Sequence, residues 1–299
     1  MQILLKRVIA NRSYCNKFTR KWTGTIFTIW SIVALFTPFD DLMNNINSWL
    51  VKLFVSLLIV LTVFICIYTI GAFIVLNTDM IELLDAGDNH HVYVQYGDVF
   101  SPEVLGKNAN CKKRNILISA NRCFDTIVDD NLITSNSLHG AAMNILYTDR
   151  VFTQDTLNKA IQKQIRNMPF ITVDKTQKPS GNQKKYAEGT IAEITASPDV
   201  TFFFLGLTSF DAQLHPYITN VEYVTALSKA LKYCMDRNQG YPVIIPLIGG
   251  GRSETKKEEE DILKFLVKLI KLNKQSINCD IHIIIRNSAK ETTTITDLE

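Results

Sequence analysis

Three short stretches of the sequence hold residues that suit the binding of a nucleotide. The stretch IIPLIGGGRSE, Ile244 to Glu254, has three consecutive glycines, Gly249, Gly250 and Gly251, followed by Arg252. Because glycine has no Cβ atom, backbone N–H groups there can approach a phosphate closely, and Arg252 can add a charge-assisted contact. No Gly-Lys-Ser/Thr follows, so the stretch differs from a Walker A loop. A plain turn is the alternative interpretation.

Asp98 and Asn121 are the other two candidates. Asp98 follows the strand-like run HHVYVQYG, and Asn121 lies in ILISANRCFD. A carboxylate can accept hydrogen bonds from an adenine amino group, and an asparagine side chain can bind ribose hydroxyls. For each residue alone, a role in a turn or a cap is the alternative.

An α/β domain is predicted to position these residues. Strands alternate with helices, which indicates a largely parallel sheet with helices on both faces. Ligands of such sheets bind outside the carboxyl ends of the strands, where the candidate residues lie. The expected strands are His90–Phe100, Asn115–Asp125, Thr190–Ile194, Val200–Thr208, Pro242–Ile248 and Cys279–Asn287, and the expected helices are Ser137–Asp149, Thr153–Asn167, Asn220–Arg237 and Thr255–Leu272.

Finer expectations concern the ends of these elements. Asn220 is a candidate N-cap, and Thr255 with Glu258 has the spacing of a capping box, which would start the last helix near Thr255. The segment Lys175 to Lys185 reads as a polar loop. The tail from Asn287 onward is expected to be frayed.

The first 76 residues differ from the rest and suit a membrane. Leu53 to Leu76 is a stretch of 24 residues without charge or proline, long enough to span a bilayer as a helix. Trp22 to Phe39 is shorter, 18 residues, and a signal-peptide core is its alternative. It runs into TPFDD rather than a cleavage site, so two transmembrane helices forming a hairpin are predicted.

Charge sets the expected orientation of this hairpin. Residues 1–21 are basic, whereas the connection between the spans, Pro38 to Val51, has two aspartates and no basic residue. The N-terminus and residues 77–299 are therefore predicted to be cytoplasmic, with the short loop outside. Neither span contains an ionisable residue, so no ion path is visible and simple anchoring is the default interpretation.

Composition excludes several other classes. The formal charge of +3 is too small to make nucleic acid the expected partner. The six cysteines are scattered without a CxxC pair, which argues against a metal site or a disulfide framework and fits a reducing compartment. No cofactor and no metal are expected.

The three motifs GDVF, ILISANRCFDT and VIIPLIGGG, taken in order, resemble the macro domain, an ADP-ribose-binding α/β/α module. The resemblance covers most of Val92 to Asn287 and implies an α/β/α sandwich with a mixed, largely parallel sheet. It implies that Asp98, with Val99 beside it, holds adenine and that Asn121 holds the distal ribose. The glycines of the third motif would bind the diphosphate.

One departure from that family concerns the loop after Asn121. Macro domains usually have a second glycine-rich loop there, but this chain has FDTIVDDNLITSNSLHG. Asp125 and the four residues of the SLHG motif are therefore ligand-binding candidates, and a distal group larger than plain ADP-ribose is expected beside them. The same departure weakens a hydrolase interpretation, and no catalytic residue is assigned. The SLHG motif consists of Ser137, Leu138, His139 and Gly140.

Two spans followed by this divergent macro domain resemble the ThsA effectors of type II Thoeris antiphage systems. That resemblance implies a multi-pass protein of the bacterial inner membrane, which binds a histidine-linked ADP-ribose signal made from NAD by a TIR-domain enzyme. Binding would then compromise the bilayer and kill the infected cell, with a homo-oligomer as the working form. Three alternatives stay open: a membrane-anchored ADP-ribosyl hydrolase, a plain ADP-ribose reader, and a scaffold that has lost its ligand.

Overall fold

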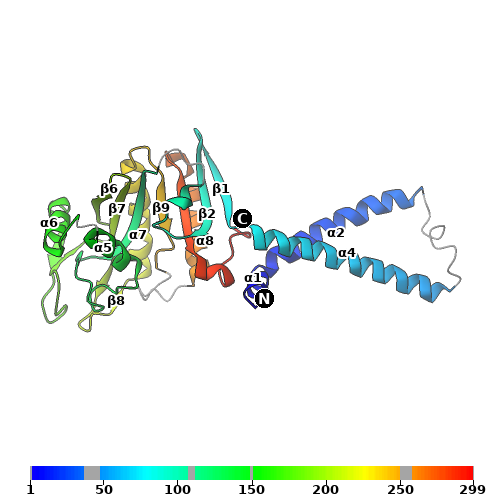
Figure 1. Cartoon of the computed structure of the whole chain (residues 1–299), viewed down its shortest axis with the longest axis horizontal. Helices are drawn as coiled ribbons and strands as arrows, with labels where there is room; N and C mark the ends of the chain where they lie inside the picture. The colour runs from blue at the N-terminus through cyan, green and yellow to red at the C-terminus, as the bar shows by residue number, and fades with distance from the viewer. Residues whose placement is uncertain (1, 37–47, 107–111, 149–150, 250–257, 299) are drawn as a thin grey trace. The chain divides into compact units, whose positions relative to one another are not determined.

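The computed structural model describes residues 2–36, 48–106, 112–148, 151–249 and 258–298. The chain forms two compact units, which are described separately. The first contains Met1–Ile81 together with Ser288–Glu299, and the second contains Glu82–Asn287. Figure 1 shows the helices of the first unit and the sheet of the second.

The second unit is built on a mixed sheet in the order β1-β2-β10-β9-β3-β7-β6, with β8 beside β7. Strands β2, β10, β9, β3 and β7 run parallel to one another, whereas β6 and β8 are antiparallel to β7. The predicted mixed, largely parallel sheet is confirmed. The strands are β1 (Met80–Gly87), β2 (His90–Gly97), β3 (Arg114–Asn121), β6 (Ile191–Ser197), β7 (Val200–Phe210), β8 (Pro216–Tyr217), β9 (Val243–Pro246) and β10 (Ile281–Arg286).

Alternation along β7 shows how helices cover both faces of this sheet. Phe202 and Phe204 are buried in a cluster with residues of α5 (Leu138–Thr148) and α6 (Gln154–Gln164). Phe203 points to the other face, where its ring meets Tyr233 at 5.5 Å between centroids. Tyr233 belongs to α7 (Asn220–Arg237), and α8 (Glu259–Leu272) likewise buries one apolar side. Successive side chains of a strand point to opposite faces, so the domain has three layers, α/β/α.

The ends of several elements differ from the predictions. The N-cap of α7 is Thr219 rather than Asn220, and it forms a full capping box with Glu222. The last helix begins at Glu259, and Glu258 has an extended backbone, so the predicted start at Thr255 is wrong. Short elements that the prediction omitted are β1, β8, the two-stranded sheet of β4 (Phe170–Thr172) and β5 (Lys184–Tyr186), and the 3-10 helices Pro102–Leu105, Lys274–Ser276 and Asn287–Glu291.

The first unit contains α1 (Gln2–Ala10), α2 (Arg12–Ala34) and α4 (Trp49–Asn77). Among the described residues, α4 is the one helix long and apolar enough to cross a membrane by length and composition. It contains the predicted span Leu53 to Leu76. The other predicted span, Trp22 to Phe39, falls partly within α2, and its last three residues lie outside the described part of the chain.

The C-terminal tail is not frayed as predicted. After a 3-10 helix it continues to residue 298, with Thr293 and Ile295 each 1% exposed. Its contacts are to the N-terminal helices, within the first unit.

Candidate functional site

Strand register brings the three predicted motifs to one level at the carboxyl edge of the sheet. Val243 of β9 is level with Asn115 of β3 and with Ile281 of β10, which is itself level with Val92 of β2. Asn121 is the last residue of β3, Asp98 directly follows β2, Asn287 directly follows β10, and Gly249 comes three residues after the end of β9. Asp98 and Asn121 are three strands apart, or roughly 14 Å at the usual strand spacing.

Strand β9 ends before its neighbours, and the glycine loop begins there. Its pairing stops at Pro246, while β3 continues to Asn121 and β10 to Arg286. Gly249 has a φ of 99°, a conformation that favours glycine. The buried Tyr223 of α7 donates a hydrogen bond to the carbonyl oxygen of Ile248 at 2.6 Å, which fixes the start of the loop. Gly250, Gly251 and Arg252 lie outside the described residues.

Asp98 is exposed at the end of β2 and forms a turn. Its Oδ1 accepts a hydrogen bond from the backbone N–H of Phe100 at 3.0 Å. Val99 is only 8% exposed and belongs to the main apolar cluster. The Asp98 carboxylate therefore faces solvent at the rim, whereas the Val99 side chain packs into the core.

Asn121 combines a satisfied acceptor with an unsatisfied donor. The side chain is buried, and Oδ1 accepts from the N–H of Cys123 at 3.0 Å and from that of Asp125 at 3.4 Å. Nδ2 is also buried and has no hydrogen-bond partner among the described residues. Buried donors are nearly always paired, so this amide is a ready donor for a ligand oxygen.

Asp125 is buried and forms an ion pair. It is 1% exposed, and its carboxylate lies 3.0 Å from Nζ of Lys178, which is equally buried. Asp125 also accepts from the N–H of Asn182 at 2.6 Å, and Lys178 donates to the carbonyl of Ser180 at 2.6 Å. Burial raises the pKa of Asp125, and the positive charge of Lys178 opposes that rise.

The backbone of the polar loop closes directly over this pair. Gly181 has a φ of 75°, and a Cβ atom there would lie 2.2 Å from Oδ1 of Asp125. Sequence alone gave no sign of this arrangement, because Lys178 is one of several lysines in a segment that reads as a solvated loop. The same is true of Tyr223, an ordinary helix tyrosine in the sequence.

Three residues of the SLHG motif have structural roles. Ser137 precedes α5: its Oγ donates to the carbonyl of Thr134 at 2.7 Å and accepts from the N–H of Gly140 at 3.0 Å. A Cβ atom at Gly140 would lie 2.3 Å from the Thr134 carbonyl oxygen, so only glycine fits there. Leu138 packs against the apolar cluster.

His139 is buried among apolar groups. Its ring centroid lies 5.7 Å from that of Phe204, and Nε2 has no hydrogen-bond partner in the described part of the chain. Burial lowers the pKa of His139 to about 4. His282 on β10 is also buried, and the same effect lowers its pKa to about 4.

We expect these two histidines to make the second unit less stable in mild acid. The folded protein keeps them neutral while the unfolded chain binds protons below pH 6.5, so acid favours unfolding. Each should cost about 1.4 kcal/mol per pH unit between pH 6.5 and about 4. Urea unfolding at several pH values tests this. His139→Leu should lower the pH slope by about 1.4 kcal/mol per pH unit between pH 6.5 and about 5, and an unchanged slope would contradict the assignment.

The described cavities do not include the carboxyl edge of the sheet, where Asp98, Asn121 and Gly249 lie. One of about 340 Å³ is lined by Asp125 to Ile127, by Gln154, Asp155 and Asn158 of α6, and by Gly181 and Asn182. Another, of about 570 Å³, lies between α6 and β6. Neither is lined by Asp98, Asn121 or Gly249, and the residues after Gly249 are outside the described part. Within that part there is no group of three metal-binding side chains.

Two sequence comparisons match this chain to known proteins. Residues 92–286 match the family model described as Thoeris protein ThsA, Macro domain. The chain is 25% identical over 240 residues to the Thoeris protein ThsA of Bacillus amyloliquefaciens (strain Y2), covering 79% of this chain and 72% of that protein.

Solved macrodomains of Oceanobacillus iheyensis are also similar. The structure with ADP has a TM-score of 0.47 and 9% identity, covering 72% of this chain and 93% of that one. The structure with MES bound has a TM-score of 0.46 and 8% identity, with 71% and 90% covered. Since the family model spans most of the chain, this protein belongs to the Thoeris ThsA family and carries its macro domain.

Proposed function

We propose that the protein is a ligand-gated membrane effector of antiphage defence. Its macro domain binds an ADP-ribose derivative, with histidine-linked ADP-ribose as the leading candidate, made by a TIR-domain partner. Binding changes the state of the N-terminal helices in the bacterial inner membrane, which damages the bilayer and kills the infected cell. The working form is a homo-oligomer, and nucleic acid has no part in it.

The alignment of Asp98, Asn121 and Gly249 along one edge carries this proposal. Only an extended ligand can reach from Asp98 to Asn121, since three strand spacings separate them. In the proposed pose adenine lies at Asp98, the diphosphate at the loop that begins with Gly249, and the distal ribose at the unpaired Nδ2 of Asn121.

The group beyond the distal ribose is proposed to lie at the cavity of about 340 Å³ that Asp125, Thr126 and Ile127 line. Asp125 donates its backbone N–H to Oδ1 of Asn121, which connects that cavity to the ribose position. Ser137 and Gly140 are occupied in capping and packing α5, so they now take a supporting role.

The membrane part of the proposal rests on α4 and α2. Only 6% of the most apolar part of α4 is buried, as a lipid-facing helix requires. Several hydroxyl side chains of both helices bond to their own helix, which satisfies them in hydrocarbon surroundings. Hydroxyls that donate to the carbonyl oxygen four residues earlier are those of Thr25, Thr28, Ser31, Ser56 and Thr62.

The geometry favours binding over hydrolysis. The loop after Asn121 contains three carboxylates that could act as a base, and each has another role. Asp125 is paired with Lys178. Asp129 accepts the N–H of Leu132 at 2.7 Å, and Asp130 accepts that of Ser135 at 2.8 Å. We therefore assign no catalytic residue.

Asn121→Asp tests the proposed site. The new carboxylate keeps an acceptor for Cys123 and Asp125, removes the donor Nδ2, and places a buried negative charge close to the proposed diphosphate position. We expect the Kd for ADP-ribose, measured by calorimetry on the full chain in detergent, to rise about 100-fold, the equivalent of one charged hydrogen bond. Parallel titration with histidine-linked ADP-ribose would reveal whether the conjugate is preferred.

Asn115→Asp is the matched control. Asn115 is the other buried asparagine of β3, and its Nδ2 donates to the carbonyl of Asn238 at 2.9 Å, at the opposite end of the strand. This variant should lose stability but bind ADP-ribose within about twofold of the wild type, since it changes no rim contact. Equal binding by Asn121→Asp and the wild type would contradict the proposed pose.

A further inference from the structure

The C-terminal residues 288–298, here called the strap, are a built part of the first unit. Ala289, Thr293 and Ile295 are each 1% exposed, and Leu298 is 8% exposed. The sequence of this segment, SAKETTTITDL, has too few apolar residues to fold alone. Its burial therefore depends on the helices that it contacts.

Asn11, between α1 and α2, is the centre of these contacts. It is only 2% exposed. Its Oδ1 accepts hydrogen bonds from the hydroxyl of Thr296, at 2.8 Å, and from that of Thr294. Its Nδ2 donates to the carbonyl of Arg7 at 2.8 Å. One buried amide thus joins the two ends of the chain, and buried polar groups of this kind are costly to separate.

Ion pairs surround this buried contact. Lys17 lies 2.6 Å from Asp297, and Lys6 lies 3.2 Å from Glu291. Asp79, just after α4, pairs with Lys290 at 3.0 Å. The strap therefore has charged contacts with α1, with α2 and with the residue that follows α4.

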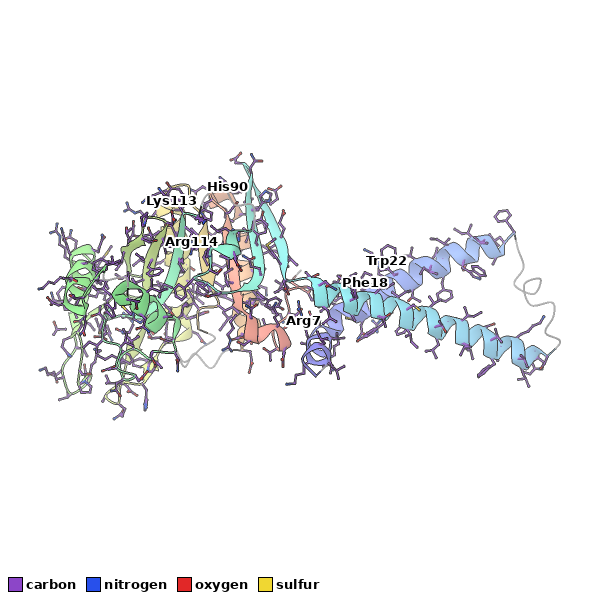
Figure 2. The ribbon with its side chains drawn as sticks, in the orientation of Figure 1. Arg7, Phe18, Trp22, His90, Lys113 and Arg114 are labelled. Atoms are coloured by element: carbon purple, nitrogen blue, oxygen red, sulfur yellow. The ribbon has the colours of Figure 1, made fainter. Side chains whose placement is uncertain are left out.

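Asp79 also pairs with Arg7 at 2.9 Å, and that guanidinium donates to the carbonyl of Thr78 at 2.8 Å. Arg7, labelled in Figure 2, thus ties α1 to the end of α4.

The same stripe of α1 and α2 that holds Asn11 packs against α4. Arg7, Asn11, Cys15 and Thr19 are buried at intervals of four residues, which places them on one face. On α4, Ile67, Gly71 and Val75 are buried at the same interval. At Gly71 a Cβ atom would lie 3.1 Å from the ring of Phe18, so the helices meet closely there (Figure 2).

We propose that the strap transmits the ligand-induced change from the edge of the sheet to the membrane helices. This inference rests on the proposed function. Arg286, the last residue of β10, pairs with Gly97 of β2, so Asn287 leaves the sheet beside Asp98 at the proposed ligand rim. The chain thus enters the macro domain from α4 through β1 and returns to α1 and α2 through the strap. A movement of this rim is then transmitted through the strap to α1 and α2, whereas a tail without these contacts would not transmit the movement.

The test separates transmission through the strap from ligand binding. The full chain in lipid nanodiscs is examined by hydrogen exchange, with and without saturating ADP-ribose. The variant Thr294→Val with Thr296→Val removes both hydroxyls that reach Asn11 and keeps their shape. Asn11→Ala removes the same contact from the other side. Thr292→Val is the control, because Thr292 is exposed in the same segment and bonds only locally, to the carbonyl of Ala289.

We expect ADP-ribose to change exchange in residues 2–34 of the wild type and of Thr292→Val by about threefold or more. In the strap variants that change should vanish while the Kd for ADP-ribose stays within about twofold. The inference would be overturned if the change in exchange of residues 2–34 persists in the strap variants. It would also be overturned if these residues show the same change in the absence of ADP-ribose. Failure of the wild type to bind ADP-ribose would instead count against the proposed function.

Discussion

Replacing Lys178 by methionine is expected to lower the free energy of unfolding of the macro domain by about 3 to 5 kcal/mol. Lys178 and Asp125 are each 1% exposed and 3.0 Å apart. Without Lys178, the Asp125 carboxylate would be buried with no opposing charge, and it would either remain ionised at high cost or take up a proton. Urea unfolding of the full chain, followed by hydrogen exchange of β3 and β7, measures the loss.

The control is Lys175→Met, an exposed lysine of the same loop. It should change stability by less than about 0.5 kcal/mol. A second variant, Asp125→Asn combined with Lys178→Met, removes both charges and should recover part of the loss, because no unpaired charge stays buried. A Lys178→Met chain as stable as the wild type would mean that the pair is open to water in solution.

The pair also explains a limit of the sequence interpretation. The motif containing Asp125 was visible, and the ligand role was a reasonable hypothesis for a carboxylate close to Asn121. Its partner Lys178 comes from a loop with several lysines, and nothing local distinguishes that one. Only the left-handed turn at Gly181 brings the loop backbone over the carboxylate. Long-range burial of a charge leaves no periodic pattern to find.

The central strands were predictable for the opposite reason. β3, β9 and β10 are buried on both faces, so they read as short apolar runs with clear limits. Parallel strands bring their carboxyl ends to one edge, which is why residues far apart in sequence could be assigned to one rim. Edge strand β1 was missed because its sequence, MIELLDAG, is interrupted by Glu82 and Asp85, is partly exposed along its whole length and directly follows an apolar helix.

The tail was mispredicted because its partners are at the other end of the chain. Thr294 and Asn11 are 283 residues apart. A segment rich in threonine and charge satisfies every local criterion for disorder. The stripe on α1 and α2 was the available signal, since Asn11 lies on it between Arg7 and Cys15 and a buried polar residue there needs a partner.

Gly140→Ala is the second variant with a large expected effect, and its sign opposes simple helix propensity. In a helix, alanine is favoured over glycine by about 1 kcal/mol. Here the added Cβ would lie 2.3 Å from the carbonyl oxygen of Thr134 and 2.9 Å from that of Ser135. Both are backbone atoms, so the loop must move. We expect a net loss of about 3 kcal/mol, the upper part of the usual range for overpacking.

Ala141→Gly measures the propensity at the neighbouring position of α5 and should cost about 1 kcal/mol, with no effect on the loop. In Gly140→Ala, by contrast, hydrogen exchange should accelerate in residues 129–137, because Asp129, Asp130 and Ser137 hold that loop by short-range bonds that a shifted backbone breaks. A Gly140→Ala chain more stable than the wild type would mean that the loop yields without cost. The SLHG glycine would then be explained by ligand contact rather than by packing against the loop that follows Asn121.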